Sequence, residues 1–245
     1  MRVLSYNIHH GVGADGRLDL ERTAGAIAGS AAELVGLQEV DRHFSGRSGF
    51  VDQAAWLGER LGMHVAFGPA LDRSPPSPGA PRRQYGNAVL AGPEILGWRN
   101  LLLPRPEGGE QRALLDALVV VEGRPLRFLT THLQNGSATE RLAQVAAIRD
   151  VLVGLPPPVV LVGDLNAPPG AAEVRRLATV LDDAWVTAGR GRGATYHAAA
   201  PTRRIDYVLT TPDLVATAAG VPATRASDHR PVQADLESAG PGDGG

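Results

Sequence analysis

Residues 158–166 read Pro158-Val159-Val160-Leu161-Val162-Gly163-Asp164-Leu165-Asn166, an apolar run that ends in an acid and an amide one residue apart. An apolar run of this length is typical of a strand buried on both faces, and alternate side chains of a strand share a face. Asp164 and Asn166 would then point together from the end of a rigid sheet, as a pair that suits a divalent cation or a phosphoryl group. By itself the stretch fits a turn equally well, because Asp and Asn start turns and Pro168-Pro169-Gly170 follows.

The composition fits one large domain. A chain of 245 residues with 43% hydrophobic content can bury a substantial core, and no long Ser- or Gly-rich linker divides it. We predict a single domain over residues 1–237 and a disordered, Gly-rich tail over residues 238–245. The net charge is −2 and all 24 basic residues are Arg, so binding of phosphate would depend on local arginines and not on an overall positive field.

The chain contains no cysteine, which excludes disulfides, thiolate metal sites and cysteine nucleophiles. Its first residues lack the apolar stretch of a signal peptide, and no run approaches the length of a membrane span. We therefore expect a cytoplasmic, monomeric protein without a transmembrane segment.

Apolar periodicity predicts the order of strands and helices. Besides the strand before Asp164, strands are expected over residues 3–8, 34–37, 64–67, 87–91, 114–121, 126–131, 205–209 and 232–236. Helices are expected over residues 19–32, 51–61, 138–155 and 171–181, with a loop over 71–85. Hairpins mixed with helices favour an α+β domain, with sheets packed face to face and helices outside, over a doubly wound parallel sheet.

Six segments place a polar residue at or just beyond a strand. These residues are Asn7, Glu39, His132, Asp164 with Asn166, Asp206, and Asp228 with His229. If the strand ends meet at one rim, they form an oxygen-rich site with two imidazoles, which suits Mg²⁺ or Mn²⁺ better than structural zinc. Taken singly, each residue also fits a structural role as a solvated acid, a cap or a core histidine.

The ordered set of motifs resembles the endonuclease/exonuclease/phosphatase superfamily, the deoxyribonuclease I-like phosphodiesterases. The matching segments are Ser5–Gly11, Leu37–Asp41, Thr131–Leu133, Gly163–Asn166, Arg204–Tyr207 and Ser227–Pro231. The resemblance implies a four-layer α/β/β/α sandwich, in which two mostly antiparallel sheets pack face to face between outer helices. It also implies a hydrolase that uses Mg²⁺ or Mn²⁺ and cleaves a phosphoester by in-line attack of an activated water.

The resemblance carries roles over to individual residues. Glu39 resembles the principal metal ligand, Asn7 a neighbour that binds metal or phosphate, and Asp228 a further acidic member of the metal site. Asp164 resembles the residue that orients or deprotonates the attacking water, and Asn166 the amide that holds a phosphoryl oxygen.

The remaining roles concern the phosphate and the rest of the substrate. His132 and His229 resemble phosphate-contacting histidines, and Asp206 resembles the acid that hydrogen-bonds the far nitrogen of His229. Four further residues lie in segments that members of the superfamily use near the substrate: Arg47, Tyr85, Asn87 and Arg112.

One departure from the superfamily pattern concerns the first strand. Several nuclease members carry an acid two residues after the strand's Asn, where this chain has His9, followed by His10. The pair fits either a changed metal environment, which would favour Mn²⁺, or simple loop structure.

Three functions follow from these motifs. The leading prediction is hydrolysis of a small or lipid-derived phosphoester. The alternative is a nuclease acting on DNA or RNA, against which stand the net charge of −2 and the absence of Lys. A non-catalytic member that binds a phosphorylated ligand would lack at least one central residue, whereas all are present.

Overall fold

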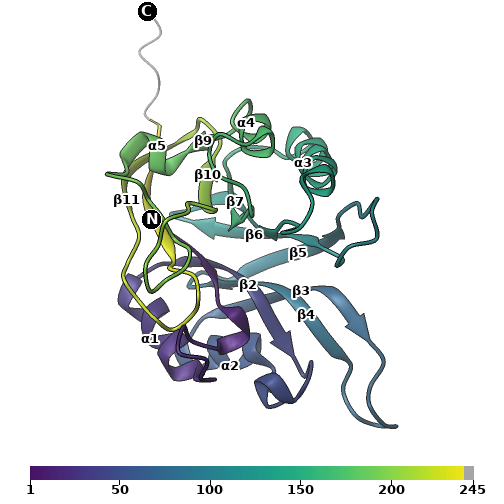
Figure 1. Cartoon of the computed structure of the whole chain (residues 1–245). Helices are drawn as coiled ribbons and strands as arrows, with labels where there is room; N and C mark the ends of the chain where they lie inside the picture. The colour runs from purple at the N-terminus through teal and green to yellow at the C-terminus, as the bar shows by residue number, and fades with distance from the viewer. Residues whose placement is uncertain (240–245) are drawn as a thin grey trace, which may run out of the picture.

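The computed structural model describes residues 1–239, which form two six-stranded sheets (Figure 1). The first sheet contains β1 (Arg2–Asn7), β2 (Leu34–Arg42), β3 (His64–Arg73), β4 (Arg83–Ala91), β11 (Leu214–Gly220) and β12 (Val232–Ser238). The second contains β5 (Ile95–Leu102), β6 (Ala113–Val121), β7 (Arg124–His132), β8 (Val159–Asp164), β9 (Asp182–Asp183) and β10 (Asp206–Thr210). The strand orders are β11-β12-β1-β2-β4-β3 and β5-β6-β7-β8-β10-β9. Pairing is parallel between β1 and β2 and between β7 and β8, and antiparallel elsewhere in these sheets.

Helices cover the outer faces of the two sheets (Figure 1). Helices α1 (Leu20–Ser30) and α2 (Gln53–Leu61) pack on the first sheet, and α3 (Ala138–Val153) and α4 (Ala172–Leu177) pack on the second. The short elements are α5 (Ala184–Ala188) and the 3₁₀ turns η1 (His9–Gly11) and η2 (Gly46–Ser48). Buried apolar residues form one cluster between the sheets and one beneath each helical layer. The predicted four-layer α+β sandwich is therefore confirmed.

Local sequence signals set the limits of the helices. Asp19, Asp52 and Ser137 cap the first turns of α1, α2 and α3 by accepting hydrogen bonds from backbone N–H groups. At the other end of α2, Gly62 adopts the left-handed conformation that ends a helix. Helices α1, α3 and α4 end two to four residues earlier than the apolar periodicity alone predicts, whereas α2 ends at Leu61 as predicted and begins two residues later.

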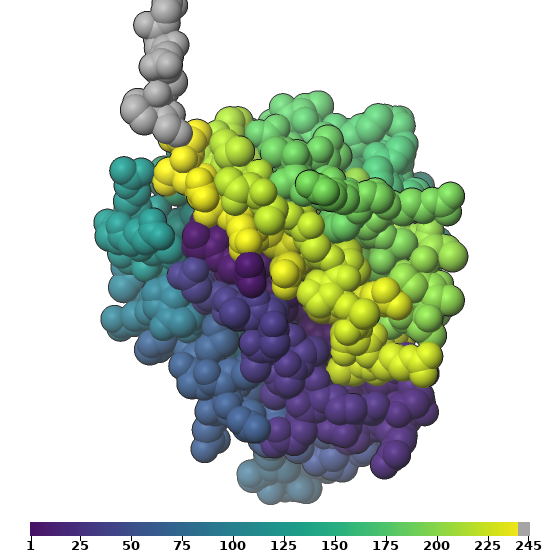
Figure 2. All heavy atoms as spheres, turned by 90° about the vertical axis from the view of Figure 1, so that its left-hand side faces the viewer, coloured from purple at the N-terminus to yellow at the C-terminus, as the bar shows by residue number. Residues whose placement is uncertain are grey.

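The two sheets approach closely along their middle strands. A side chain at Gly36 on β2 would bring its Cβ within 2.2 Å of a Val162 methyl on β8, so this contact requires glycine. Figure 2 shows that the N-terminal segment lies against the C-terminal strands, in keeping with the antiparallel pairing of β1 with β12. The first and last strands therefore fix the two ends of the described chain next to each other.

Several elements escape the sequence prediction. The expected loop over residues 71–85 is partly strand, because β3 and β4 pair from His64↔Ala91 as far as Arg73↔Arg83 through backbone hydrogen bonds that need no apolar side chains. Strands β5, β9 and β11 and helix α5 were not predicted, since each is short or exposes apolar residues such as Trp98. Strand β12 extends to Ser238, and residues 240–245 of the predicted tail lie outside the described residues. Within residues 1–239, none of the helices has the length and apolar character needed to cross a membrane.

Candidate active site

The polar strand ends meet at one rim of the sandwich. Parallel pairing sets Asn7 beside Gln38, and His132 beside Asp164, while antiparallel pairing sets Asp206 opposite Asp164. A cavity of about 730 Å³ opens at this rim, and its lining includes Glu39, Asp164 and His229. At the same rim, Ser227 Oγ donates to the carbonyl oxygen of Asn7, a residue 220 positions earlier in the chain.

Glu39 reaches the cavity because β2 is irregular at this point, and not because the strand ends there. Pairing with β4 shifts between Leu37 and Val40, so Gln38 and Glu39 together oppose Asn87. Glu39 itself has a φ of 58°, in the left-handed region. A bulge of this kind redirects a side chain and is typical of strands beside active sites. The strand then continues to Arg42, beyond the predicted end.

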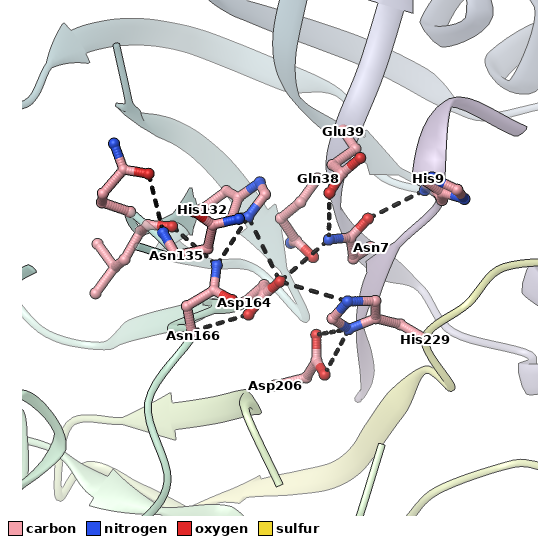
Figure 3. Close-up of polar contacts among 12 residues, drawn as sticks. Asn7, His9, Gln38, Glu39, His132, Asn135, Asp164, Asn166, Asp206 and His229 are labelled. Atoms are coloured by element: carbon pink, nitrogen blue, oxygen red, sulfur yellow. Dashed lines mark hydrogen bonds and ion pairs between the residues drawn. The ribbon is translucent and has the colours of Figure 1, made fainter. Parts of the chain in front are cut away.

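Asp164 lies at the centre of the cluster (Figure 3). Its Oδ2 accepts a hydrogen bond from Asn7 Nδ2 at 3.1 Å and lies 3.5 Å from His132 Nε2 and 3.7 Å from His229 Nε2. Its Oδ1 accepts from the backbone N–H of Asn166 at 2.9 Å. Burial first, and then the charge of Asp206, raise the pKa of Asp164 above its ordinary value. A buried carboxylate with a raised pKa beside an imidazole is suited to accept a proton.

His229 is held in a fixed orientation by Asp206 (Figure 3). His229 Nδ1 donates to both Asp206 carboxylate oxygens, at 3.0 and 3.2 Å, and Thr195 Oγ1 donates to the same carboxylate. Burial alone would lower the pKa of His229, but Asp206 and Asp164 outweigh that effect and raise it to about 10. His229 is therefore an imidazolium at neutral pH, with Nε2–H directed toward Asp164 and the cavity.

His132 has the opposite charge state. Burial, then the charges of Arg112 and His229, lower the pKa of His132 well below its ordinary value. Arg112 Nη1 lies 3.1 Å from His132 Nδ1, and His132 Nε2 lies 3.5 Å from Asp164 Oδ2. Asn166 Nδ2 lies 3.1 Å from His132 Nε2 and donates to the carbonyl oxygen of Leu133 at 3.0 Å. A charged imidazole ring, His229, and a neutral one, His132, thus face the same space.

The donor set fits a divalent cation near Glu39 and Asp228. His9 Nδ1 lies 3.8 Å from Asp228 Oδ1, and His10 Nδ1 lies 4.0 Å from Glu39 Oε2, so two carboxylates and two imidazoles line one corner of the cavity. Burial, then the charges of Arg47 and His9, lower the pKa of His10 to about 4, so its ring is neutral at neutral pH. Carboxylate oxygens and neutral imidazoles are both ligands of divalent ions.

Asn7 is turned differently from what a metal ligand requires. Its Nδ2 donates to Glu39 Oε1 and to Asp164 Oδ2, both at 3.1 Å, while its Oδ1 accepts from the backbone N–H of His9 at 3.0 Å. The amide joins the two carboxylates, and its oxygen would have to leave His9 to bind a cation. Asp164, Asp206 and His229 also lie close enough to share a metal ion. However, His229 Nδ1 already donates its hydrogen to Asp206, so this nitrogen has no lone pair for an ion.

Two arginines, Arg47 and Arg112, form a cationic wall of the cavity that Glu39 also lines. Arg47 forms two hydrogen bonds with the fully buried Asp41, at 2.7 and 2.9 Å, and lies over the rings of Phe44 and Tyr85. These contacts hold its guanidinium in one place beside the cavity. Arg112 adds a second guanidinium, whose Nη1 pairs with Glu110 at 3.1 Å and whose Nε is buried without a hydrogen-bond partner within residues 1–239. The wall therefore offers positive charge to an anionic substrate group.

Comparison with known proteins identifies the family of this chain. Residues 4–229 match the model of the Endonuclease/Exonuclease/phosphatase family. The chain belongs to this family. An endonuclease/exonuclease/phosphatase from Beutenbergia cavernae DSM 12333 is 31% identical, with a TM-score of 0.84 over 98% of this chain and 72% of that one.

Two more distant structures share the family fold. A mannosyl-6-phosphatase from Bacteroides thetaiotaomicron is 18% identical, with a TM-score of 0.78 over 97% of this chain and 99% of that one. The human nocturnin catalytic domain with a bound sulfate anion is 21% identical, with a TM-score of 0.71 over 98% of this chain and 93% of that one. The same fold thus occurs in proteins of different names, and the resemblance inferred from the motifs is confirmed at the level of family and fold.

The structure brings most of the predicted site residues of this family member to the cavity. Those that line it are Glu39, Arg47, Tyr85, Arg112, His132, Asp164, Asn166, Asp228 and His229. Asn7 and Asp206 lie directly behind them and act through the hydrogen bonds described above. Asn87 is buried away from the lining, where its Nδ2 donates to the carbonyl oxygen of Ala113 at 2.9 Å.

Other lining residues carried little sequence signal. Tyr196 packs its ring 4.7 Å from that of His229, and Arg203 lies over the same tyrosine. Gln134, Asn135 and Glu110 complete the opposite side. Gln134 and Asn135 follow His132 by two and three residues, so the end of that strand was the available clue. Glu110 and Arg203 lie in loops without any apolar pattern.

Proposed function

We propose that this chain is a phosphoester hydrolase, a phosphodiesterase or phosphatase, that acts with Mg²⁺ or Mn²⁺ on a small or lipid-derived substrate. The observation that carries the proposal is the arrangement of Asp164 between a charged His229 and a neutral His132. Membership of a hydrolytic, generally metal-dependent family supports it. The cytoplasmic location and the monomeric state stay predictions.

On this proposal, each side chain of the site has a task. Asp164 accepts the proton of the attacking water, because its raised pKa brings it closer to neutral pH. His229 Nε2–H and the Asn166 amide stabilise negative charge that develops on the phosphoryl oxygens. Asp206 keeps His229 charged and oriented, and Thr195 in turn holds Asp206.

Glu39 and Asp228 would hold the divalent cation. When bound, the cation supplies positive charge that polarises a phosphoryl oxygen. Asn7 contributes indirectly, because its amide donates hydrogen bonds to both Glu39 and Asp164 and holds the two carboxylates at a fixed separation.

The dimensions and charges of the site support a compact substrate. The lining contains Glu39, Glu110, Asp164 and Asp228 as well as arginines, so it offers no continuous positive track for a nucleic-acid backbone. Two arginines that a basic surface would need, Arg82 and Arg204, do not line the cavity and pair with Asp72 at 2.6 Å and Asp183 at 2.8 Å. Arg47 and Arg112 suffice for one additional anionic group.

A substrate screen with matched variants tests the proposal. Wild-type protein with Mg²⁺ or Mn²⁺ should hydrolyse bis-p-nitrophenyl phosphate or one of a set of nucleotides, sphingomyelin-like lipids and inositol phosphates, and chelation with EDTA should stop turnover. Asp164→Asn should lower kcat by about 10²- to 10⁴-fold, the usual contribution of a general base. Asp213→Asn, at an exposed acid outside the cavity, serves as the control and should be unaffected. Full turnover in Asp164→Asn would refute the assigned role.

A further inference from the structure

The imidazoles of His9 and His10 face the same cavity as Glu39, and the proposed hydrolysis uses neither of them. Donor atoms of these three residues all lie within 4.8 Å of one another. His10 Nδ1 is buried, lies 4.0 Å from Glu39 Oε2 and has no hydrogen-bond partner within residues 1–239. A buried nitrogen without a partner costs free energy unless a ligand satisfies it.

The backbone of His9 and His10 is strained, and neighbouring residues hold it in that conformation. His9 and His10 have φ values of 45° and 43°, which non-glycine residues rarely adopt. The buried Gln53 holds the turn, since its Nε2 donates to the carbonyl oxygen of His10 at 2.7 Å and its Oε1 accepts from Asp41 N–H at 2.9 Å. The turn brings the two ring centroids within 4.5 Å of each other. Strain that is kept in place beside a cavity is typical of functional sites.

In each of the two histidines, one ring nitrogen is available to bind a metal ion. His9 Nδ1 lies 3.3 Å from the carbonyl oxygen of Val12 and donates to it, which leaves the lone pair on His9 Nε2. A backbone carbonyl that fixes the tautomer in this way is the usual support of a histidine that binds metal. His10 offers Nδ1, the unpartnered atom.

We propose that His9, His10 and Glu39 form a nitrogen-containing site for a first-row transition-metal ion, one that favours Mn²⁺ over Mg²⁺. Imidazole nitrogen suits transition metals, whereas Mg²⁺ prefers a shell composed entirely of oxygen. The site goes beyond the proposed hydrolase, which needs only the carboxylates of Glu39 and Asp228.

Metal binding without substrate tests the proposal. Chelator-stripped protein is titrated with Mn²⁺ and with Mg²⁺, and pulsed electron paramagnetic resonance of bound Mn²⁺ detects directly coordinated ¹⁴N. The variants are His9→Asn, His10→Asn and the double variant, because Asn tolerates the left-handed backbone better than other residues that lack the ring. His64→Asn, at an exposed histidine on β3, is the matched control.

Wild-type protein should show ¹⁴N coupling, and each single variant should bind Mn²⁺ about tenfold or more weakly, with a smaller loss for Mg²⁺. The double variant should lose the ¹⁴N signal, and His64→Asn should match wild type. Absence of ¹⁴N coupling in wild type overturns the proposal even if the variants do not fold. Wild-type Mn²⁺ affinity in the folded double variant also overturns it. A protein that binds Mn²⁺ through nitrogen but hydrolyses no phosphoester would refute only the proposed function.

Discussion

The charge on His229 depends on one neighbour more than on any other. Asp206 accepts both hydrogen bonds from His229 Nδ1 and is the leading cause that raises the pKa of the ring. In Asp206→Asn the imidazolium loses this partner, so the pKa of His229 should fall from about 10 by at least one unit. Nuclear magnetic resonance titration of the histidine ring nitrogens measures the change, with Asp213→Asn as the control. An unchanged titration of His229 would contradict the role of Asp206.

The pair of His229 and Asp206 makes the stability of the fold depend on pH. Because the pKa of His229 in the fold lies above its ordinary value of 6.5, protonation of the ring stabilises the folded state. This contribution is complete below pH 6.5 and is lost as the pH rises through about 10. We therefore expect Asp206→Asn to destabilise the protein most near pH 6 and least near pH 10, as measured by urea unfolding at each pH. A loss of stability that does not depend on pH would indicate a purely structural role for Asp206.

The packing of β2 on β8 depends on a residue without a side chain. A Cβ at Gly36 would come within 2.2 Å of Val162 Cγ2 and 3.0 Å of Thr130 Cβ on the facing sheet. Gly36→Ala should consequently lower the free energy of unfolding by about 1–3 kcal/mol, the usual cost of overpacking a core. Adding Val162→Ala should recover part of the loss, and a double-mutant cycle from urea unfolding measures that coupling. Gly25→Ala, at an open position on α1, should not lose stability. Equal stability of Gly36→Ala and wild type would show that the sheets can separate at no cost.

Elements with a buried apolar pattern could be predicted from sequence, and elements held by pairing alone could not. The strand before Asp164 is buried along its whole length, so composition identifies it. Strand β2 was expected to stop at Gln38 and Glu39, because polar residues normally end an apolar run; the bulge that turns Glu39 inward exists only through pairing with β4. The position of Arg47 is a similar case, since it depends on the buried Asp41 and on the ring of Tyr85, which packs from β4. Spacing within one segment cannot reveal such contacts.

The charges of the protein as a whole lead to a prediction about substrate size. A net charge of −2 and a cavity lined by acids as well as arginines give little long-range attraction for a polyanion. A protein that grips six to ten nucleic-acid phosphates loses about 10³- to 10⁵-fold in affinity between 50 and 200 mM salt. A compact phosphoester that contacts only Arg47, Arg112 and His229 releases far fewer counterions. We therefore expect kcat/KM for the best small substrate to change by less than about tenfold over this range.

Plasmid nicking over the same salt series provides the comparison. If the chain prefers small phosphoesters, nicking should be slow at every salt concentration, and Arg47→Met should impair hydrolysis of the small substrate more than nicking. Rapid nicking that collapses between 50 and 200 mM salt, together with weak hydrolysis of every small phosphoester, would instead identify a nuclease. Hydrolysis of either substrate class would require Asp164 and His229 in the cavity. Only an extended polyanion also needs contacts beyond the cavity, so the salt dependence of the rate separates the two outcomes.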